Sequence, residues 1–167
     1  RLDAISVEEG SRIKKGEIIA RLEGEDLKAQ RAQAVANLAA AKYNFKQAQA
    51  ELEDARTNFK RADALVKNGY ISRSEYDTAE TRFAKARAAL SSSEAAIKSF
   101  EAALDAAAVN LEYTLIRAPF DAVVLTKNAD IGDIVTPIGA AANAKSAVVT
   151  IADMDSLEVE VDVSESN

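Results

Sequence analysis

Apolar residues recur every seven positions along two long stretches of this sequence, separated by a short break at residues 67–71. The first stretch carries Leu38, Phe45, Leu52, Phe59 and Val66, and the second carries Tyr76, Phe83, Leu90, Ile97, Leu104 and Leu111. The positions between these large residues, at alternating spacings of four and three, are mostly alanine, with Ser93 and Phe100 as the exceptions. A strict seven-residue repeat is typical of a left-handed coiled coil. So short a break predicts two antiparallel helices joined as a hairpin.

The composition of residues 25–111 supports this prediction. The segment is rich in Ala, Lys, Gln and Glu, contains no proline, and has Gly69 as its only glycine, a strongly helix-favouring mixture. A first helix over about 25–67 would be roughly 65 Å long, too extended for the core of a compact domain of this size. The segment holds 13 Lys/Arg and 12 Asp/Glu, interspersed as on exposed coiled-coil faces.

Short apolar runs separated by turn residues flank the helical segment on both sides. Residues 10–13 (Gly-Ser-Arg-Ile) resemble residues 132–135 (Gly-Asp-Ile-Val), a weak internal repeat that links the two flanks. We therefore predict an α+β fold in which one small β module is made of two halves, 1–24 and 112–147, with the hairpin inserted between them. Apolar and acidic residues alternate after residue 156, as in a half-buried strand, so residues 148–167 are predicted to begin a further, truncated β-barrel domain.

The composition argues against several classes of function. The 167 residues include no Cys, His or Trp and one Met, which removes the commonest metal ligands and the usual nucleophile–base pairs. We therefore expect that the protein is not an enzyme and has neither a metal site nor a cofactor. No basic stripe with interleaved aromatic residues is present, so no nucleic-acid partner is expected. No apolar run is long enough to span a membrane, and any signal segment or membrane anchor is expected outside this chain.

The order of these segments resembles the periplasmic adaptor proteins, the HlyD-like membrane fusion proteins of bacterial tripartite efflux and secretion systems. Residues 5–20 resemble the first half of a lipoyl- or biotinyl-like module, residues 113–124 its returning half, and residues 152–159 the entry into a β-barrel. Ala122 departs from the family, which usually has glycine after the Ala-Pro turn. The resemblance implies a periplasmic location, with the full-length protein anchored in the inner membrane. It also implies a homo-oligomeric ring, expected to be a hexamer, which bridges an inner-membrane transporter and a TolC-like outer-membrane channel.

The resemblance extends to the break between the helices. Arg61, Leu65 and Ser72 stand at the Arg-x3-Leu-x6-Ser spacing that adaptors of TolC-like channels carry at their hairpin tip. By resemblance, Arg61 and Ser72 hydrogen-bond the channel's helix ends and Leu65 packs into a groove between its helices. Gly69, Tyr70 and Ile71 complete this predicted docking tip.

Apart from Leu65, each tip residue also has a purely structural interpretation. Ser72-Arg73-Ser74-Glu75 is a capping box for the second helix, and a capping hydroxyl that only accepts a hydrogen bond keeps its proton for a partner. Arg61 could instead pair with a neighbour such as Asp54 or Asp63. The structural roles for the rest are a left-handed helix end at Gly69 and a plug for the coil at Tyr70 and Ile71.

Several functional alternatives stay open. The resemblance is closest to adaptors of ABC-type macrolide pumps, and adaptors of proton-driven (RND) pumps are a second possibility. A type I secretion adaptor of the same family is a third possibility, and a purely structural coiled-coil spacer is a rival from another class. A lipoate or biotin carrier at Lys14-Lys15 is disfavoured, because the modified lysine of such carriers sits where the two halves join, and the hairpin replaces that junction here.

Overall fold

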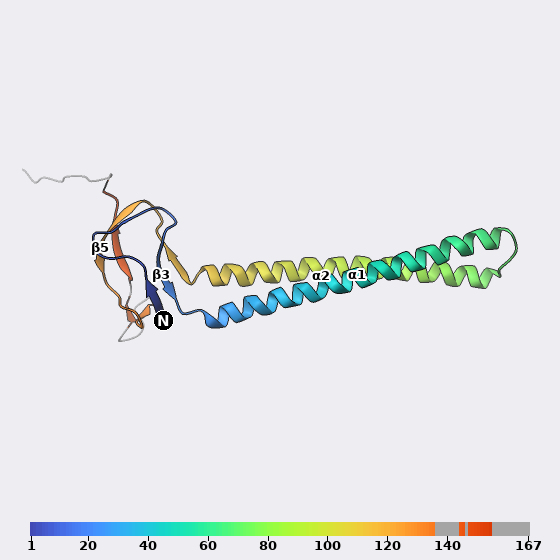
Figure 1. Cartoon of the computed structure of the whole chain (residues 1–167), viewed down its shortest axis with the longest axis horizontal. Coiled ribbons are helices and arrows are strands. Elements are labelled where there is room, and N and C mark those ends of the chain that lie inside the picture. The colour runs from blue at the N-terminus through green and yellow to red at the C-terminus, as the bar shows by residue number, and fades with distance from the viewer. Residues whose placement is uncertain (136–143, 146, 155–167) are drawn as a thin grey trace, which may run out of the picture. The chain divides into compact units, whose positions relative to one another are not determined.

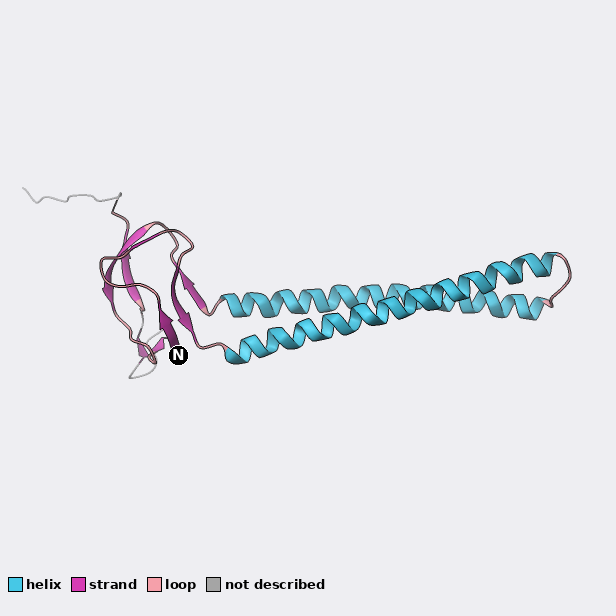
Figure 2. Cartoon of the chain, in the orientation of Figure 1, coloured by secondary structure: helices cyan, strands magenta, loops and turns pink. Residues whose placement is uncertain are grey.

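The computed structural model describes residues 1–135, 144–145 and 147–154, which fall into two units. One unit comprises residues 26–110 and is helical (Figure 1). The other is built from the chain on both sides of the helical unit and is made of strands (Figure 2).

The helical unit is the predicted antiparallel hairpin, formed by α1 (Glu25–Lys67) and α2 (Arg73–Glu112) lying side by side (Figure 1). The residues at the heptad positions are buried or half-buried, apart from Phe100, which is 37% exposed. Phe59 of α1 stacks on Phe83 of α2, with ring centroids 5.4 Å apart. The seven-residue repeat therefore defines the seam between the helices, as the sequence predicted.

Ion pairs across the hairpin lie beside this seam. Arg82 of α2 bonds Asp54 of α1 at 3.1 Å, and Lys42 of α1 lies 3.8 Å from Glu101 of α2. All four side chains are about half exposed or more, so each pair contributes little to stability. Burial of the apolar seam is the main term that holds the helices together.

The other unit contains two three-stranded antiparallel sheets and a short parallel pair. The sheet orders are β1-β3-β4 and β2-β5-β8, and β6 pairs with β7. The strands are β1 (Leu2–Ile5), β2 (Arg12–Ile13), β3 (Ile18–Leu22), β4 (Leu115–Arg117), β5 (Ala122–Lys127), β6 (Ile134–Val135), β7 (Ala144–Lys145) and β8 (Val149–Ala152). In each three-stranded sheet, strands from before the hairpin pair with strands from after it. The pairing confirms that the hairpin is an insertion in one β module.

A single apolar core joins the two three-stranded sheets. Its buried members are Leu2, Val7, Ile13, Ile19, Ala20, Ala118, Ala122, Val124, Ala129 and Val148. They come from both halves of the chain, so neither half could form this core alone.

One predicted domain boundary needs correction. Residues 148–167 were expected to begin a separate barrel, but β8 pairs with β5 and Val148 is buried in the core of the small β module. The Val148 carbonyl also accepts hydrogen bonds from the N–H groups of Asn128 and Ala129 at 2.9 and 3.2 Å. Residues 148–152 therefore belong to the small β module, because their apolar side chains complete its core. The alternating segment after residue 156 lies outside the described residues.

Neither helix has a stretch that is apolar enough over a sufficient length to cross a membrane. This finding covers the residues that the structure describes.

Candidate functional site

The first helix ends in a glycine-dependent cap. Gly69 has a φ of 72°, and its N–H bonds the carbonyl of Val66 at 3.1 Å. The N–H of Tyr70 bonds the carbonyl of Leu65 at 3.0 Å. These two bonds form a Schellman motif, which satisfies the last carbonyls of the helix and requires the left-handed conformation that glycine adopts without strain. The structural role predicted for Gly69 is confirmed.

The second helix begins at the predicted capping box. The Ser72 hydroxyl oxygen accepts a hydrogen bond from the Glu75 N–H at 3.2 Å, and the Ser72 N–H donates to Oε2 of Glu75 at 2.8 Å. The Ser72 hydroxyl also donates its proton to the same Oε2, at 2.9 Å. This last bond corrects the expectation that the proton is free for a partner, because Glu75 already accepts it.

The capping box changes the acidity of Glu75. The hydrogen bond from the Ser72 N–H, followed by the bond from the Ser72 hydroxyl, lowers the pKa of the Glu75 carboxyl below its usual value. Hydrogen bonds donated to a carboxylate favour its charged form. The tip of α2 therefore carries a carboxylate at neutral pH.

Arg61 is exposed near the end of α1, and within the described part of the chain its guanidinium makes one hydrogen bond, from Nη1 to Oδ1 of Asn58 at 3.1 Å. Neither predicted acidic partner pairs with it. Asp63 bonds Lys67 at 2.7 Å, and Asp54 bonds Arg82 at 3.1 Å. Among the described residues Arg61 thus makes no ion pair, and most of its five N–H donors remain available.

The apolar residues of the predicted tip differ in exposure. Leu65 and Ile71 are half-buried, whereas Tyr70 is 76% exposed. A residue that exposed cannot seal the end of the coil, so the plug interpretation fails for Tyr70. An aromatic ring held out at the connection of the two helices is suited to contact with another molecule.

Sequence reasoning did not identify the aromatic cluster beneath the tip. The Phe59 ring lies 5.7 Å from that of Tyr76, in addition to its stacking on Phe83. The Arg73 guanidinium lies 5.0 Å from the Tyr76 ring and bonds Asp77 at 3.1 Å. The signal was present in the sequence as aromatic residues at heptad positions on both sides of the break, Phe59 before it and Tyr76 and Phe83 after it.

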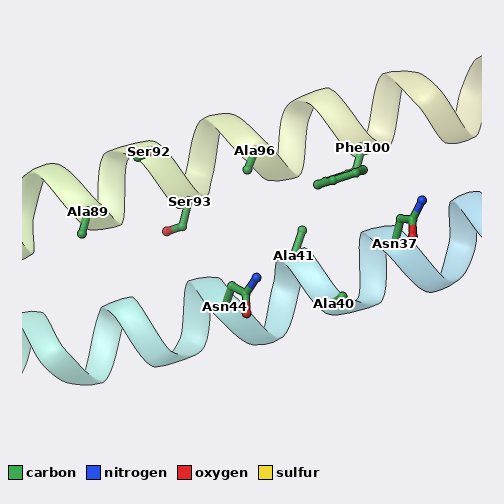
Figure 3. Close-up of a pocket in the computed structure, with 9 residues that line it drawn as sticks. All are labelled: Asn37, Ala40, Ala41, Asn44, Ala89, Ser92, Ser93, Ala96 and Phe100. Carbon is green, nitrogen blue, oxygen red and sulfur yellow. The ribbon is translucent and has the colours of Figure 1, made fainter.

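A second surface feature is a groove between the helices, of about 560 Å³. Figure 3 shows Phe100 and Ala41 directed into the space between the two ribbons. The groove is lined by Asn37, Ala40, Ala41, Asn44, Ala89, Ser92, Ser93, Ala96 and Phe100. A second depression of about 250 Å³ shares Ala89 and continues toward Ala55 and Arg82. The first depression is thus lined mostly by small, uncharged side chains, whereas the second is also bordered by the charged residues Glu51, Arg82 and Lys85.

The described residues contain no group of acidic side chains placed to hold a metal ion. The side chains present at the tip can form hydrogen bonds, ion pairs and apolar contacts.

The chain is similar to one protein family and to several known proteins. Residues 41–114 match the family described as "RND MFP, alpha-helical hairpin domain". The macrolide export protein MacA of Escherichia coli O157:H7 is 32% identical over 181 aligned residues, which cover 100% of this chain and 44% of that protein. The multidrug resistance protein MdtE of Escherichia coli K12 is 28% identical over 153 residues, covering 92% of this chain and 35% of that protein.

A solved structure shares the fold. The crystal structure of MacA from Actinobacillus actinomycetemcomitans superposes with a TM-score of 0.79 at 22% sequence identity, covering 92% of this chain and 46% of that one. The chain spans less than half the length of each of these relatives.

Proposed function

We propose that this chain, which carries the alpha-helical hairpin domain of the RND membrane fusion proteins over residues 41–114, is part of a periplasmic adaptor in an efflux pump. The adaptor would be non-enzymatic and would link an inner-membrane transporter to a TolC-like outer-membrane channel. The hairpin tip would make the channel contact. The observation that carries the proposal is Arg61, a guanidinium without an ion pair among the described residues, on the hairpin whose tip also exposes Tyr70.

An unpaired arginine is suited to such a contact. Its planar guanidinium presents several N–H donors in a fixed fork and binds carbonyl or carboxylate oxygens well. Because the acidic residues nearest in sequence are bonded to other cations, no internal ion pair has to break when a partner binds. Leu65 and Ile71 would add apolar contact beside it.

The names of the relatives point to two classes of inner-membrane transporter. One relative is named for macrolide export and another for multidrug resistance, and the hairpin matches a family named for RND pumps. We therefore keep both ABC-type and RND transporters as partners, with drugs as the expected cargo. A type I secretion adaptor remains the alternative within the family.

We also propose that several copies pack side by side through their hairpins, as a ring that we expect to be hexameric. The groove around Ala89 supports this, because small side chains allow a neighbouring helix to approach closely. The near balance of basic and acidic residues in the hairpin supports it too, since like charges on adjacent copies would repel.

Efflux complementation tests the channel contact. In a strain that lacks its own adaptor, Arg61→Asp in the full-length protein should abolish drug resistance, while the circular dichroism spectrum stays that of the parent. Arg31→Asp is the matched control, because Arg31 is also an exposed arginine of α1. Normal resistance with Arg61→Asp would refute the docking role.

The rival spacer function is tested by crosslinking. The chain has no cysteine, so Tyr70→Cys introduces a unique thiol at an exposed tip position. A disulfide or crosslinked adduct with the channel supports the adaptor, and crosslinking without any channel adduct favours a coiled-coil spacer.

A further inference from the structure

We infer that the Ser72–Glu75 pair acts as a hydrogen-bond acceptor toward the channel, so that the channel group facing it is an N–H donor. The inference rests on the function proposed above and defines the chemistry of one of its contacts. It assigns to Glu75 a role in partner recognition in addition to capping.

The Ser72 hydroxyl already makes two of the three hydrogen bonds that it can form. A serine hydroxyl has one proton to donate and two lone pairs that accept. Its proton goes to Oε2 of Glu75 and one lone pair receives the Glu75 N–H. The Ser72 backbone N–H also donates to Oε2 of Glu75. What Ser72 can still offer a partner through its side chain is one lone pair.

The ionised carboxylate of Glu75, like the remaining lone pair of Ser72, can only accept hydrogen bonds. Its Oε2 receives both bonds from Ser72, while Oε1 has no hydrogen-bond partner among the described residues. The neighbouring guanidinium of Arg73 is bonded to Asp77 and lies over the Tyr76 ring. Glu75 is therefore an exposed negative charge beside the remaining lone pair of Ser72.

The two sides of the hairpin end then have opposite hydrogen-bonding character. Arg61 on α1 offers positively charged donors, and the Ser72–Glu75 pair on α2 offers acceptors and a negative charge. A complementary channel surface places a carbonyl or carboxylate against Arg61 and an N–H donor against Ser72 and Glu75. A contact in which the Ser72 hydroxyl donates would first have to break its bond to Glu75.

Ser72→Asp separates these two possibilities. Aspartate caps a helix as well as serine does, and its carboxylate accepts hydrogen bonds but carries no proton to donate at neutral pH. We expect the full-length Ser72→Asp protein to bind an immobilised, purified TolC-like channel about three- to tenfold more tightly, since a charged acceptor strengthens the bond. Binding equal to or weaker than that of the parent would overturn the inference.

Glu75→Gln provides a second test of the inference. Glutamine serves at this position of a capping box, so α2 should start as before, which circular dichroism can verify. Loss of the charged acceptor should weaken channel binding by about threefold or more. Unchanged or tighter binding would count against a recognition role for Glu75.

Arg61→Asp in the same binding assay keeps the two proposals distinguishable. If the parent binds the channel and Arg61→Asp does not, while Ser72→Asp weakens binding, only the acceptor inference fails. If the parent does not bind the channel, the proposed function fails and the inference fails with it.

Discussion

Gly24 lies so close to Thr114 that a β carbon on Gly24 would be 2.9 Å from Cγ2 of Thr114. Thr114 is buried, and its hydroxyl donates to the carbonyl of Leu111 at 2.7 Å. Its own carbonyl accepts the N–H of Leu22 at 2.7 Å. The chain that leads into the first helix and the chain that leaves the second thus meet at a point where no side chain fits.

Gly24→Ala should therefore destabilise the protein. Carbon atoms do not approach to 2.9 Å without displacement, and the bonded, buried Thr114 cannot move freely, so we expect a loss of about 1–3 kcal/mol in the free energy of unfolding. Urea denaturation measures it. Thr114→Ser removes the clashing methyl and keeps the hydroxyl, so Gly24→Ala should cost less in that background. Equal costs in the two backgrounds would contradict the steric explanation.

Phe59→Ala should weaken the hairpin near its tip. The ring contacts both Tyr76 and Phe83 across the seam, and truncation of a partly buried phenylalanine should cost about 2–4 kcal/mol. Thermal denaturation followed by the helix signal at 222 nm is the measurement. Tyr43→Ala is the control, since Tyr43 is 70% exposed and its loss should change stability by only about 0.5 kcal/mol.

The cap of α2 should weaken in acid. Because the pKa of Glu75 is lowered in the folded protein, its contribution is complete above the ordinary pKa of a glutamate and is lost as the pH falls through the lowered value. Amide hydrogen exchange at Tyr76, whose N–H bonds the Ser72 carbonyl, should report this loss. Ser72→Ala removes the hydroxyl bond but not the backbone bond, so it should shift the transition to higher pH. A midpoint for Glu75 at or above the ordinary glutamate pKa would contradict the prediction.

Ala89→Arg should prevent side-by-side packing without unfolding the hairpin. Ala89 is exposed and borders both depressions of the groove, so a long charged side chain there would fill the proposed contact. Sedimentation velocity of the full-length protein should show a shift from the ring to smaller species. Ala36→Arg, an exposed alanine of α1 outside the residues that line the groove, is the control. Retention of the ring by Ala89→Arg would exclude this face as the contact.

The tip illustrates how far sequence reasoning extends. Local patterns predicted the ends of both helices, because a Schellman cap at Gly69 and a capping box at Ser72 depend on residues only a few positions apart. The same patterns did not reveal that Glu75 accepts the Ser72 proton, or that Arg61 has no acidic partner among the described residues. These hydrogen bonds and ion pairs depend on which of several neighbouring side chains lie close enough to bond in the folded structure.

The amino-acid sequence was sufficient to predict the hairpin, because a seven-residue repeat and a helix-favouring composition act through interactions that recur along the chain. It also indicated that strands on both sides of the hairpin form one module. The place of residues 148–152 in that module is evident only from the folded structure, since β8 pairs with β5 and Val148 bonds the loop that follows β5. A short apolar segment can in principle pair with many different strands. The pairing that forms is the one that buries the apolar side chains of all these strands in a single core.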